Sequence, residues 1–173
     1  MKALKIILRF FNRLIYKLRT FFWSTRSKIF LGGHGKKLGV HRKSYFTKYT
    51  FLGNDCHFNG MEIRGCGKVE IGDHFHSGKN CTIITHVHNY EGKRLPYDET
   101  LIHKNVKIGK NVWIGDSVII LGGSVIDDGV IIQAGSVVVG KIPYCAIAGG
   151  HPAKPFKYRN IEHYEELLKS QDS

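Results

Sequence analysis

Residues 102–142 read IHKNVKIGKNVWIGDSVIILGGSVIDDGVIIQAGSVVVGKI, and a repeat in this stretch decides the fold. A β-branched aliphatic residue recurs in it at every sixth position: Ile102, Ile108, Ile114, Ile120, Ile126, Ile132 and Val138. A second column, of small or aliphatic residues, follows four positions after each: Val106, Val112, Val118, Ser124, Val130, Ser136 and Ile142. A period of six matches neither the helical nor the strand period. It is typical of a triangular coil whose three flat sides each take one hexapeptide.

The repeat therefore predicts an all-β fold, a parallel β-helix whose aliphatic columns stack along the axis. The same register appears upstream at Leu52, Phe58, Ile71, Ser77 and Ile83. A slip of phase at 65–67 is the kind that a solenoid accommodates at a corner. We expect the β-helix to span residues 36–142.

An interruption of the repeat predicts a protruding loop. The interval from Ile83 to Ile102 is too long for the period, so residues 85–101, THVHNYEGKRLPYDETL, leave the coil. Long loops in a regular scaffold are more often functional than accidental. This loop carries His86, His88, Tyr90, Tyr97 and Asp98.

The C-terminal residues 143–173 read as a capping tail. Pro143, Pro152 and Pro155 cannot continue a central ladder. Asn160 offers an N-cap for a short C-terminal helix, which presents Ile161, Tyr164 and Leu168 on one face.

The N-terminal residues 1–35 are basic and helical. Thirteen of the 26 Lys and Arg residues precede Asp55, the first acidic residue. Apolar and basic side chains alternate at helical spacing from residue 2 to about 23, which predicts an amphipathic helix. Its many charges exclude a membrane-spanning helix. The helix suits either an anionic membrane or a surface of the protein or its neighbour, and we expect no nucleic-acid partner.

The four cysteines form no CxxC pair, and the N-terminus offers no cleavable signal with a small-residue exit site. We expect a cytoplasmic protein, peripheral at the inner face of the membrane if the helix docks there. We assign the cysteines no chemistry, because buried unpaired cysteines behave as small hydrophobes.

Two stretches carry a family resemblance: 111–143, NVWIGDSVIILGGSVIDDGVIIQAGSVVVGKIP, and 148–159, AGGHPAKPFKYR. A Trp in one coil, an Ala-Gly-Ser in the next and a Gly-x-Pro-Ala-Lys exit resemble the hexapeptide-repeat acyltransferases, in the branch of galactoside, maltose, xenobiotic and capsule-sugar acetyltransferases. The resemblance covers roughly residues 50–159. It implies a left-handed β-helix, a homotrimer, and acetyl-CoA as acyl donor in a groove between neighbouring chains, with no metal required.

The implied chemistry needs a general base to take a proton from the acceptor hydroxyl, and histidine is suited to that at neutral pH. The resemblance implies that one loop histidine does this without a covalent acyl-enzyme. The run HNY favours His88, and His86 is the second candidate.

The resemblance also implies residues that bind the donor and the acceptor. Those for CoA are Trp113, Gly115, Asp116, Ala134, Gly135, Val139, Gly140, Lys154, Lys157 and Arg159. The last three would meet the CoA phosphates. At Val139 and Gly140 relatives often have a Thr-Lys pair, so this chain departs from the pattern there. Asn59, Tyr97 and Asp98 are the candidates for the acceptor.

We expect O-acetylation of a sugar or polysaccharide precursor of the capsule or lipopolysaccharide type. Three alternatives remain open at the level of sequence. The acceptor could be the amine of an amino sugar. The chain could be a γ-carbonic-anhydrase-like zinc enzyme, which needs three histidines around the metal; the candidates are His57, His74 and His76 with His86 or His88. It could also be a β-helix scaffold without catalytic activity.

Overall fold

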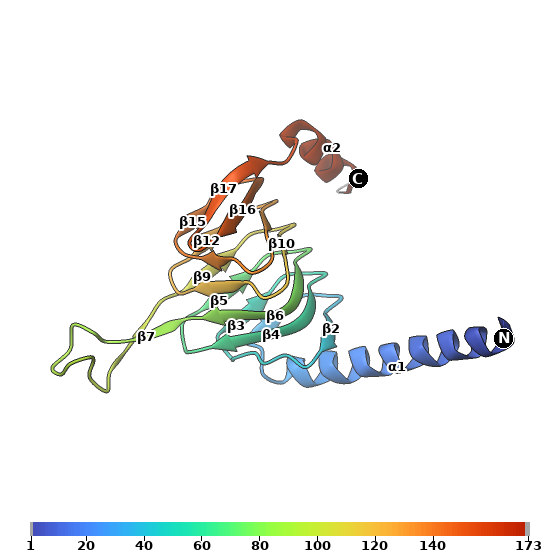
Figure 1. The fold of residues 1–173 in the computed structure, drawn as a ribbon, viewed down its shortest axis with the longest axis horizontal. Helices are drawn as coiled ribbons and strands as arrows, with labels where there is room; N and C mark the ends of the chain where they lie inside the picture. The colour runs from blue at the N-terminus through green and yellow to red at the C-terminus, as the bar shows by residue number, and fades with distance from the viewer. Residues whose placement is uncertain (1, 172–173) are drawn as a thin grey trace.

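The computed structural model describes residues 2–171, and its body is a parallel β-solenoid (Figure 1). One side of the solenoid, face A, stacks one short strand from each of six turns. In order these are β1 (Gly33–His34), β3 (Thr50–Leu52), β5 (Val69–Ile71), β9 (Val106–Ile108), β12 (Val125–Ile126) and β15 (Lys141–Ile142). The β-helix predicted from the hexapeptide period is confirmed.

The other two sides, faces B and C, form one continuous sheet, because β4 and β6 bend around the corner between them. Face B holds β2 (Gly39–Arg42), the first parts of β4 (His57–Arg64) and β6 (His76–Ile84), then β10 (Trp113–Ile114), β13 (Ile131–Ile132) and β16 (Ala146–Gly150). Face C holds the second parts of β4 and β6, then β11 (Ile119–Leu121) and β14 (Val137–Val138). We name the corners AB, BC and CA after the faces that they join.

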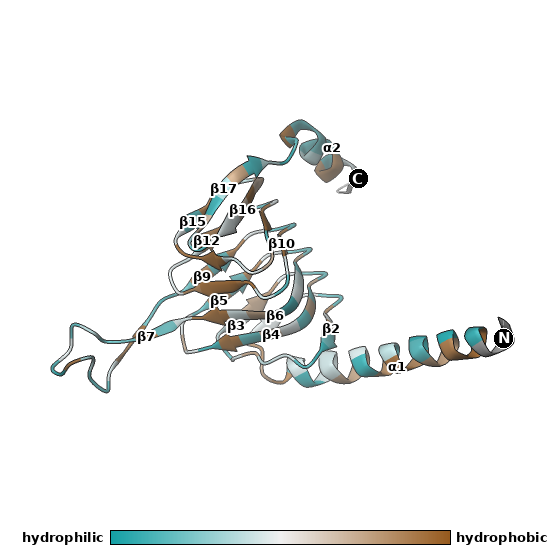
Figure 2. Cartoon of the chain, viewed as in Figure 1, coloured by the Kyte–Doolittle hydropathy of each residue, from teal (hydrophilic) through white to brown (hydrophobic). Residues whose placement is uncertain are grey.

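The core is the stack of aliphatic columns that the repeat predicts. From residue 106 onward every member of both columns is buried, with Ile114, Ile120 and Val138 fully so. Figure 2 shows the hydrophobic residues concentrated on the coil strands. Upstream the columns continue through Phe58, Phe75 and other apolar side chains. Each coil thus buries its apolar side chains against the coils above and below, which is the main favourable term in folding.

The prediction that Ile102 belongs to the core column is wrong. Ile102 lies in β8 (Leu101–His103), which pairs antiparallel with β7 (His86–His88) to form a two-stranded ribbon outside the coil. Its side chain is half-buried and faces Val87 in register. The coil itself closes beneath the ribbon, where the Lys104 N–H donates to the Thr85 carbonyl at 2.8 Å. The β-branched residue fits a ribbon strand as well as a coil, so the six-residue period alone did not separate them.

Every AB corner uses the left-handed backbone conformation. The residues there with φ between 55° and 71° are Lys37, Asp55, His74, Asn111, Gly129 and Cys145. The N–H of each from Asp55 onward donates to the carbonyl of the preceding turn's corner, at 2.8 or 2.9 Å. Since the left-handed region is unfavourable for most residues, this ladder of hydrogen bonds stabilises the corners.

The N-terminal helix α1 (Lys2–Lys28) extends beyond the predicted end near residue 23. Its C-terminal part packs on β2: the Val40 N–H donates to Ser24 Oγ at 2.9 Å, and Trp23 packs partly buried against the core. The rest of α1 projects sideways from the first coil (Figure 1). None of the helices in the described part of the chain is long and apolar enough to cross a membrane.

The C-terminal end closes the stack. Strand β17 (Ala153–Tyr158) turns back and pairs antiparallel with β16. The predicted cap at Asn160 is confirmed, since its Oδ1 accepts the His163 N–H at 3.0 Å at the start of α2 (Ile161–Gln171). Tyr164 is buried, and its hydroxyl accepts a hydrogen bond from Asn111 at 3.0 Å, which ties α2 to an AB corner.

Candidate active site

The β7–β8 ribbon carries both candidate histidines out of the CA corner (Figure 1). His86 lies at its base, opposite His103, and close to the corner glycine Gly65. Its Nδ1 atom is buried and has no hydrogen-bond partner in the structure. His88 lies further out, opposite Leu101, and is exposed. The coil thus holds His86 closely, whereas His88 is open to a ligand.

Residues of the loop beyond the ribbon differ in their freedom to contact a ligand. The Tyr97 ring stacks on His88 with their centroids 3.9 Å apart, and it is 45% exposed. The Asp98 carboxylate is buried and accepts the N–H groups of Lys93 and Thr100 and the Thr100 hydroxyl. These hydrogen bonds lower the pKa of Asp98. Tyr97 is therefore placed beside the candidate base, while Asp98 organises the loop.

Asn59 lies at the BC corner, away from the ribbon. Its side-chain amide donates to the Ser77 carbonyl at 2.9 Å. The face C part of β4, through Arg64, separates it from the CA corner at Gly65. One copy of the chain therefore does not bring Asn59 together with His88.

Four candidate CoA residues line the BC corner one turn apart. Gly115 and Asp116 follow β10, and Ala134 and Gly135 follow β13. A Cβ on Gly115 would lie 2.5 Å from the Ala134 nitrogen, so glycine permits this close stacking. The Gly135 N–H donates to the Asp116 carbonyl, and the Asp116 carboxylate accepts the Lys79 N–H at 2.7 Å. Much of the backbone here is thus paired between turns.

Trp113 projects from face B onto the surface and is 55% exposed. In the register of the sheet it lies between His76 of the preceding turn and Ile131 of the next. It lines an open depression of about 350 Å³ together with five other residues: His74, His76, Asn111, Val112 and Arg159. The predicted aromatic wall is thus accessible to a ligand.

The histidines beside Trp113 form a stack on face B. The rings of His41, His57 and His76 lie parallel, at centroid distances of 5.3 Å and 4.7 Å. The Asp55 carboxylate lies within hydrogen-bond distance of two histidines, 3.2 Å from His57 Nε2 and 3.0 Å from His74 Nδ1. The stacking itself is not predicted from the sequence, because its members come from three different turns.

The remaining candidates occupy three further places. Val139 and Gly140 lie at the CA corner, on the same edge of the solenoid as the ribbon. Lys154 and Lys157 are exposed on β17. The Arg159 Nε donates to the Gly129 carbonyl at 2.6 Å, so this guanidinium is held at an AB corner. The contact of these three basic residues with the CoA phosphates stays a prediction.

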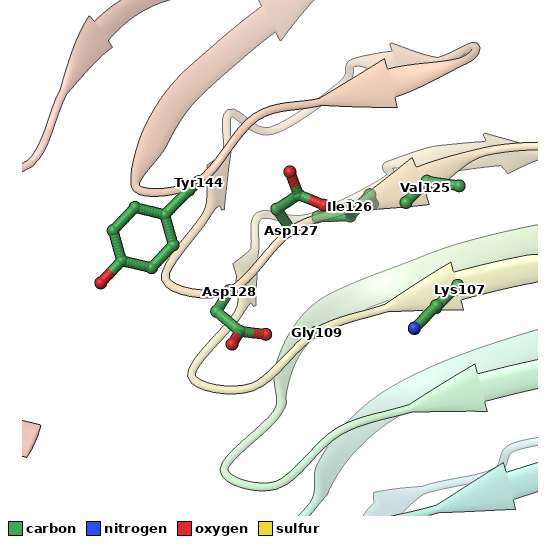
Figure 3. Close-up of a pocket in the computed structure, with 7 residues that line it drawn as sticks. All are labelled: Lys107, Gly109, Val125, Ile126, Asp127, Asp128 and Tyr144. Carbon is green, nitrogen blue, oxygen red and sulfur yellow. The ribbon is translucent and has the colours of Figure 1, made fainter.

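A depression on face A contains none of the predicted residues. It measures about 300 Å³ and is lined by the seven residues drawn in Figure 3. Its carboxylates are paired elsewhere: Asp127 with the Lys141 ammonium at 3.2 Å, and Asp128 with the Lys110 N–H at 2.7 Å. Because both carboxylates already have partners, we do not consider this depression a candidate site.

The described residues contain no group of three or more His, Cys, Asp or Glu side chains arranged to hold a metal ion. Among the cysteines, Cys56, Cys81 and Cys145 are buried, and burial raises the pKa of Cys56 to about 11. Cys66 is exposed at the CA corner.

Comparisons with known proteins agree with this geometry. Residues 105–140 match the family of bacterial transferase hexapeptide proteins (six repeats). A hexapeptide-repeat-containing acetyltransferase from Vibrio cholerae is 26% identical, with a TM-score of 0.61 over 76% of each chain. Residues 105–140 thus carry the hexapeptide repeat of bacterial transferases, and the chain is similar in sequence and fold to a hexapeptide-repeat acetyltransferase.

Two further structures share the fold of this chain. A galactoside acetyltransferase in complex with coenzyme A is 24% identical, with a TM-score of 0.65 over 79% of this chain and 70% of the other. An N-acyltransferase from Bacillus cereus, in complex with dTDP and coenzyme A, is 23% identical, with a TM-score of 0.59 over 83% and 94%. A search of curated sequences finds no significant match.

Proposed function

We propose that this acyltransferase moves the acetyl group of acetyl-CoA onto a hydroxyl of a sugar or polysaccharide precursor of the capsule or lipopolysaccharide type. The observation that carries the proposal is the ribbon, which projects an exposed histidine from an otherwise regular hexapeptide solenoid. Solved proteins of the same fold are a galactoside acetyltransferase with coenzyme A and a Vibrio cholerae acetyltransferase with acetyl coenzyme A.

In the proposed reaction His88 takes the proton of the acceptor hydroxyl as that oxygen attacks the thioester carbonyl carbon. The carbon–sulfur bond then breaks, and the CoA sulfur leaves and receives the proton. Tyr97, stacked on His88, restricts the orientation of the imidazole. Because Tyr97 is also exposed, it offers a surface on which a sugar ring can pack.

The donor site requires a second copy of the chain. His88 projects from the CA corner, whereas Gly115, Asp116 and Ala134 line the BC corner. A neighbour that places its BC corner beside this ribbon brings the two sets together. We therefore propose a homotrimer with acetyl-CoA in the groove between chains, and with Trp113 as a wall of that groove.

The test compares two histidines of the same ribbon. His88→Ala is expected to lower kcat by about a hundredfold or more with CoA affinity nearly unchanged, since the base acts on the acceptor. His86→Ala is the matched variant, and His163→Ala, exposed on α2, is the control. Calorimetric titration with CoA and a kinetic assay measure the two effects. Near-normal turnover by His88→Ala would contradict the assignment, and a loss confined to His86→Ala would move the base to His86.

An amino sugar is the second candidate acceptor, supported by the shared fold of the Bacillus cereus N-acyltransferase. A pair of nucleotide sugars that differ only in an amine or a hydroxyl at one carbon separates the two reactions. The proposed location is the cytoplasm, at the inner face of the membrane, because that compartment supplies the acyl donor and the growing lipid-linked sugars.

A further inference from the structure

Helix α1 is amphipathic along most of its length. At about 100° per residue, nine apolar residues between positions 7 and 22 fall within an arc of roughly 160° that holds no polar residue. They are Ile7, Leu8, Phe10, Phe11, Leu14, Ile15, Leu18, Phe21 and Phe22. Every one is between 41% and 73% exposed, so nothing in the described chain covers this apolar face of α1.

The opposite side of α1 is the one that faces the coil. The Tyr16 hydroxyl and Thr20 Oγ1 hydrogen-bond His41 Nδ1 at 2.8 Å and 3.2 Å, and Ser24 Oγ accepts the Val40 N–H. These contacts fix the rotation of the helix about its axis. The polar side packs on the protein, and the apolar face of α1 is held away from it.

Positive charge surrounds this apolar face. Lys17 and Arg19 stand at its two borders, and Lys5, Arg9 and Arg13 lie on the remaining arc. Residues 1–54 contain no Asp or Glu. If two copies paired their α1 helices face to face, the border cations would repel each other. Anionic lipid headgroups would instead neutralise them while the acyl region buries the apolar side chains.

We propose that α1 docks in the plane of an anionic membrane surface, with its apolar face at the boundary between headgroups and acyl chains. Its length, about 40 Å at 1.5 Å per residue, lies across the stacking direction at the N-terminal end of the solenoid (Figure 1). Docking therefore places the first coil of the solenoid nearest the membrane, with the later coils stacked away from it. Together with the proposed function, this places the ribbon, which leaves the coil after β6, about two strand spacings or roughly 10 Å above the first coil.

The test uses a neighbouring pair of isoleucines. Ile7 lies within the apolar face of α1, whereas Ile6 lies outside it and is 66% exposed. Full-length protein is floated with vesicles of phosphatidylglycerol and phosphatidylcholine in a ratio of about 3:7, and with phosphatidylcholine alone, at salt near 0.1 M and 0.5 M. Ile7→Ser is expected to weaken vesicle binding by at least about tenfold, because the serine loses the burial of an aliphatic side chain. Ile6→Ser should bind nearly as the intact protein does.

A charge-reversal variant and high salt test the electrostatic contribution to binding. Arg9→Glu/Arg13→Glu should weaken binding to the anionic vesicles, as should high salt. Circular dichroism and light scattering on each variant verify that it is folded and report its mass. The proposal is overturned if the intact protein fails to bind anionic vesicles at low salt, or if Ile6→Ser and Ile7→Ser weaken binding equally. A change of mass in Ile7→Ser without vesicle binding would assign the face to a second copy.

Vesicle binding needs no catalysis, so the proposal and the proposed function fail separately. An inactive protein that binds vesicles retains the docking inference, and an active protein that ignores them loses it.

Discussion

At the scale of single residues, the stacked imidazoles on face B predict that the stability of the protein depends on pH. Burial, and then the neighbouring His57, lower the pKa values of His41 and His76. His41 also faces Tyr16, Thr20 and Arg19 of α1, and Asp55 opposes the lowering at His76. Protons therefore bind more readily to these two histidines in the unfolded chain than in the folded one.

The sign of the pH dependence follows from linkage. A histidine whose pKa is lowered by folding destabilises the native state as pH falls below its unfolded value of about 6.5. We expect the melting temperature, followed by circular dichroism, to be level above that pH and to fall between pH of about 6.5 and 5.5. His41→Gln should reduce the fall, whereas His163→Gln on exposed α2 should keep it. A melting temperature that does not change across this range would contradict the interpretation.

The sequence predicted the core residues well and the surface geometry poorly, for a physical reason. Column residues such as Ile114 and Ile120 repeat because every turn buries the same positions. The six-residue period therefore identifies the buried residues directly. The left-handed corners at His74 and Cys145 follow no composition rule, since hydrogen bonds to the previous turn stabilise them. The role of Asp98 inside its loop depends on a fold of that loop which no period encodes.

At the scale of elements, the ribbon is an addition that the coil does not need. Lys104 bonds to Thr85 beneath it, and strand β5 pairs directly with β9 across the interruption. Replacing residues 89–100 by a two-residue turn is expected to leave the melting temperature within a few degrees of the original, while acetyl transfer is lost. Thermal melting and the kinetic assay measure both. A drop of about 5 °C or more, the effect of roughly 2 kcal/mol in a domain of this size, would mean that the loop packs on the coil. Retained activity would remove the ribbon from the site.

Prediction of elements succeeded where a periodic pattern is long and failed at its ends. The helical pattern at the N-terminus predicted α1, but the last turn, through Ser24 and Ser27, is polar and is held by contacts with β2 that the sequence does not display. The broken repeat predicts the loop, but the six-residue period assigns its return strand to the coil because Ile102 keeps the register. Tertiary pairing decided both boundaries.

At the scale of the whole molecule, the split of the candidate residues between two corners predicts an assembly. The protein should have three times the mass of one chain by light scattering. A sharper test mixes two inactive variants, His88→Ala at the CA edge and Ala134→Trp at the BC edge, under conditions that exchange subunits. If the site lies between chains, part of the activity returns, because some interfaces then carry neither substitution. No recovery in verified mixed assemblies would place the whole site within one chain.

The antiparallel turn of β17 onto β16 also makes the solenoid finite. A parallel stack ends in a row of unpaired backbone groups, which is a template for end-to-end polymerisation of identical coils into fibres. On face B that row is occupied by β17, whose Pro155 lacks an N–H group to donate to a further strand. At the opposite end, the Val40 N–H of β2 donates a hydrogen bond to Ser24 Oγ of α1 and is not free to pair with another strand. The two terminal appendages thus keep a fold that grows by repetition from growing beyond one molecule.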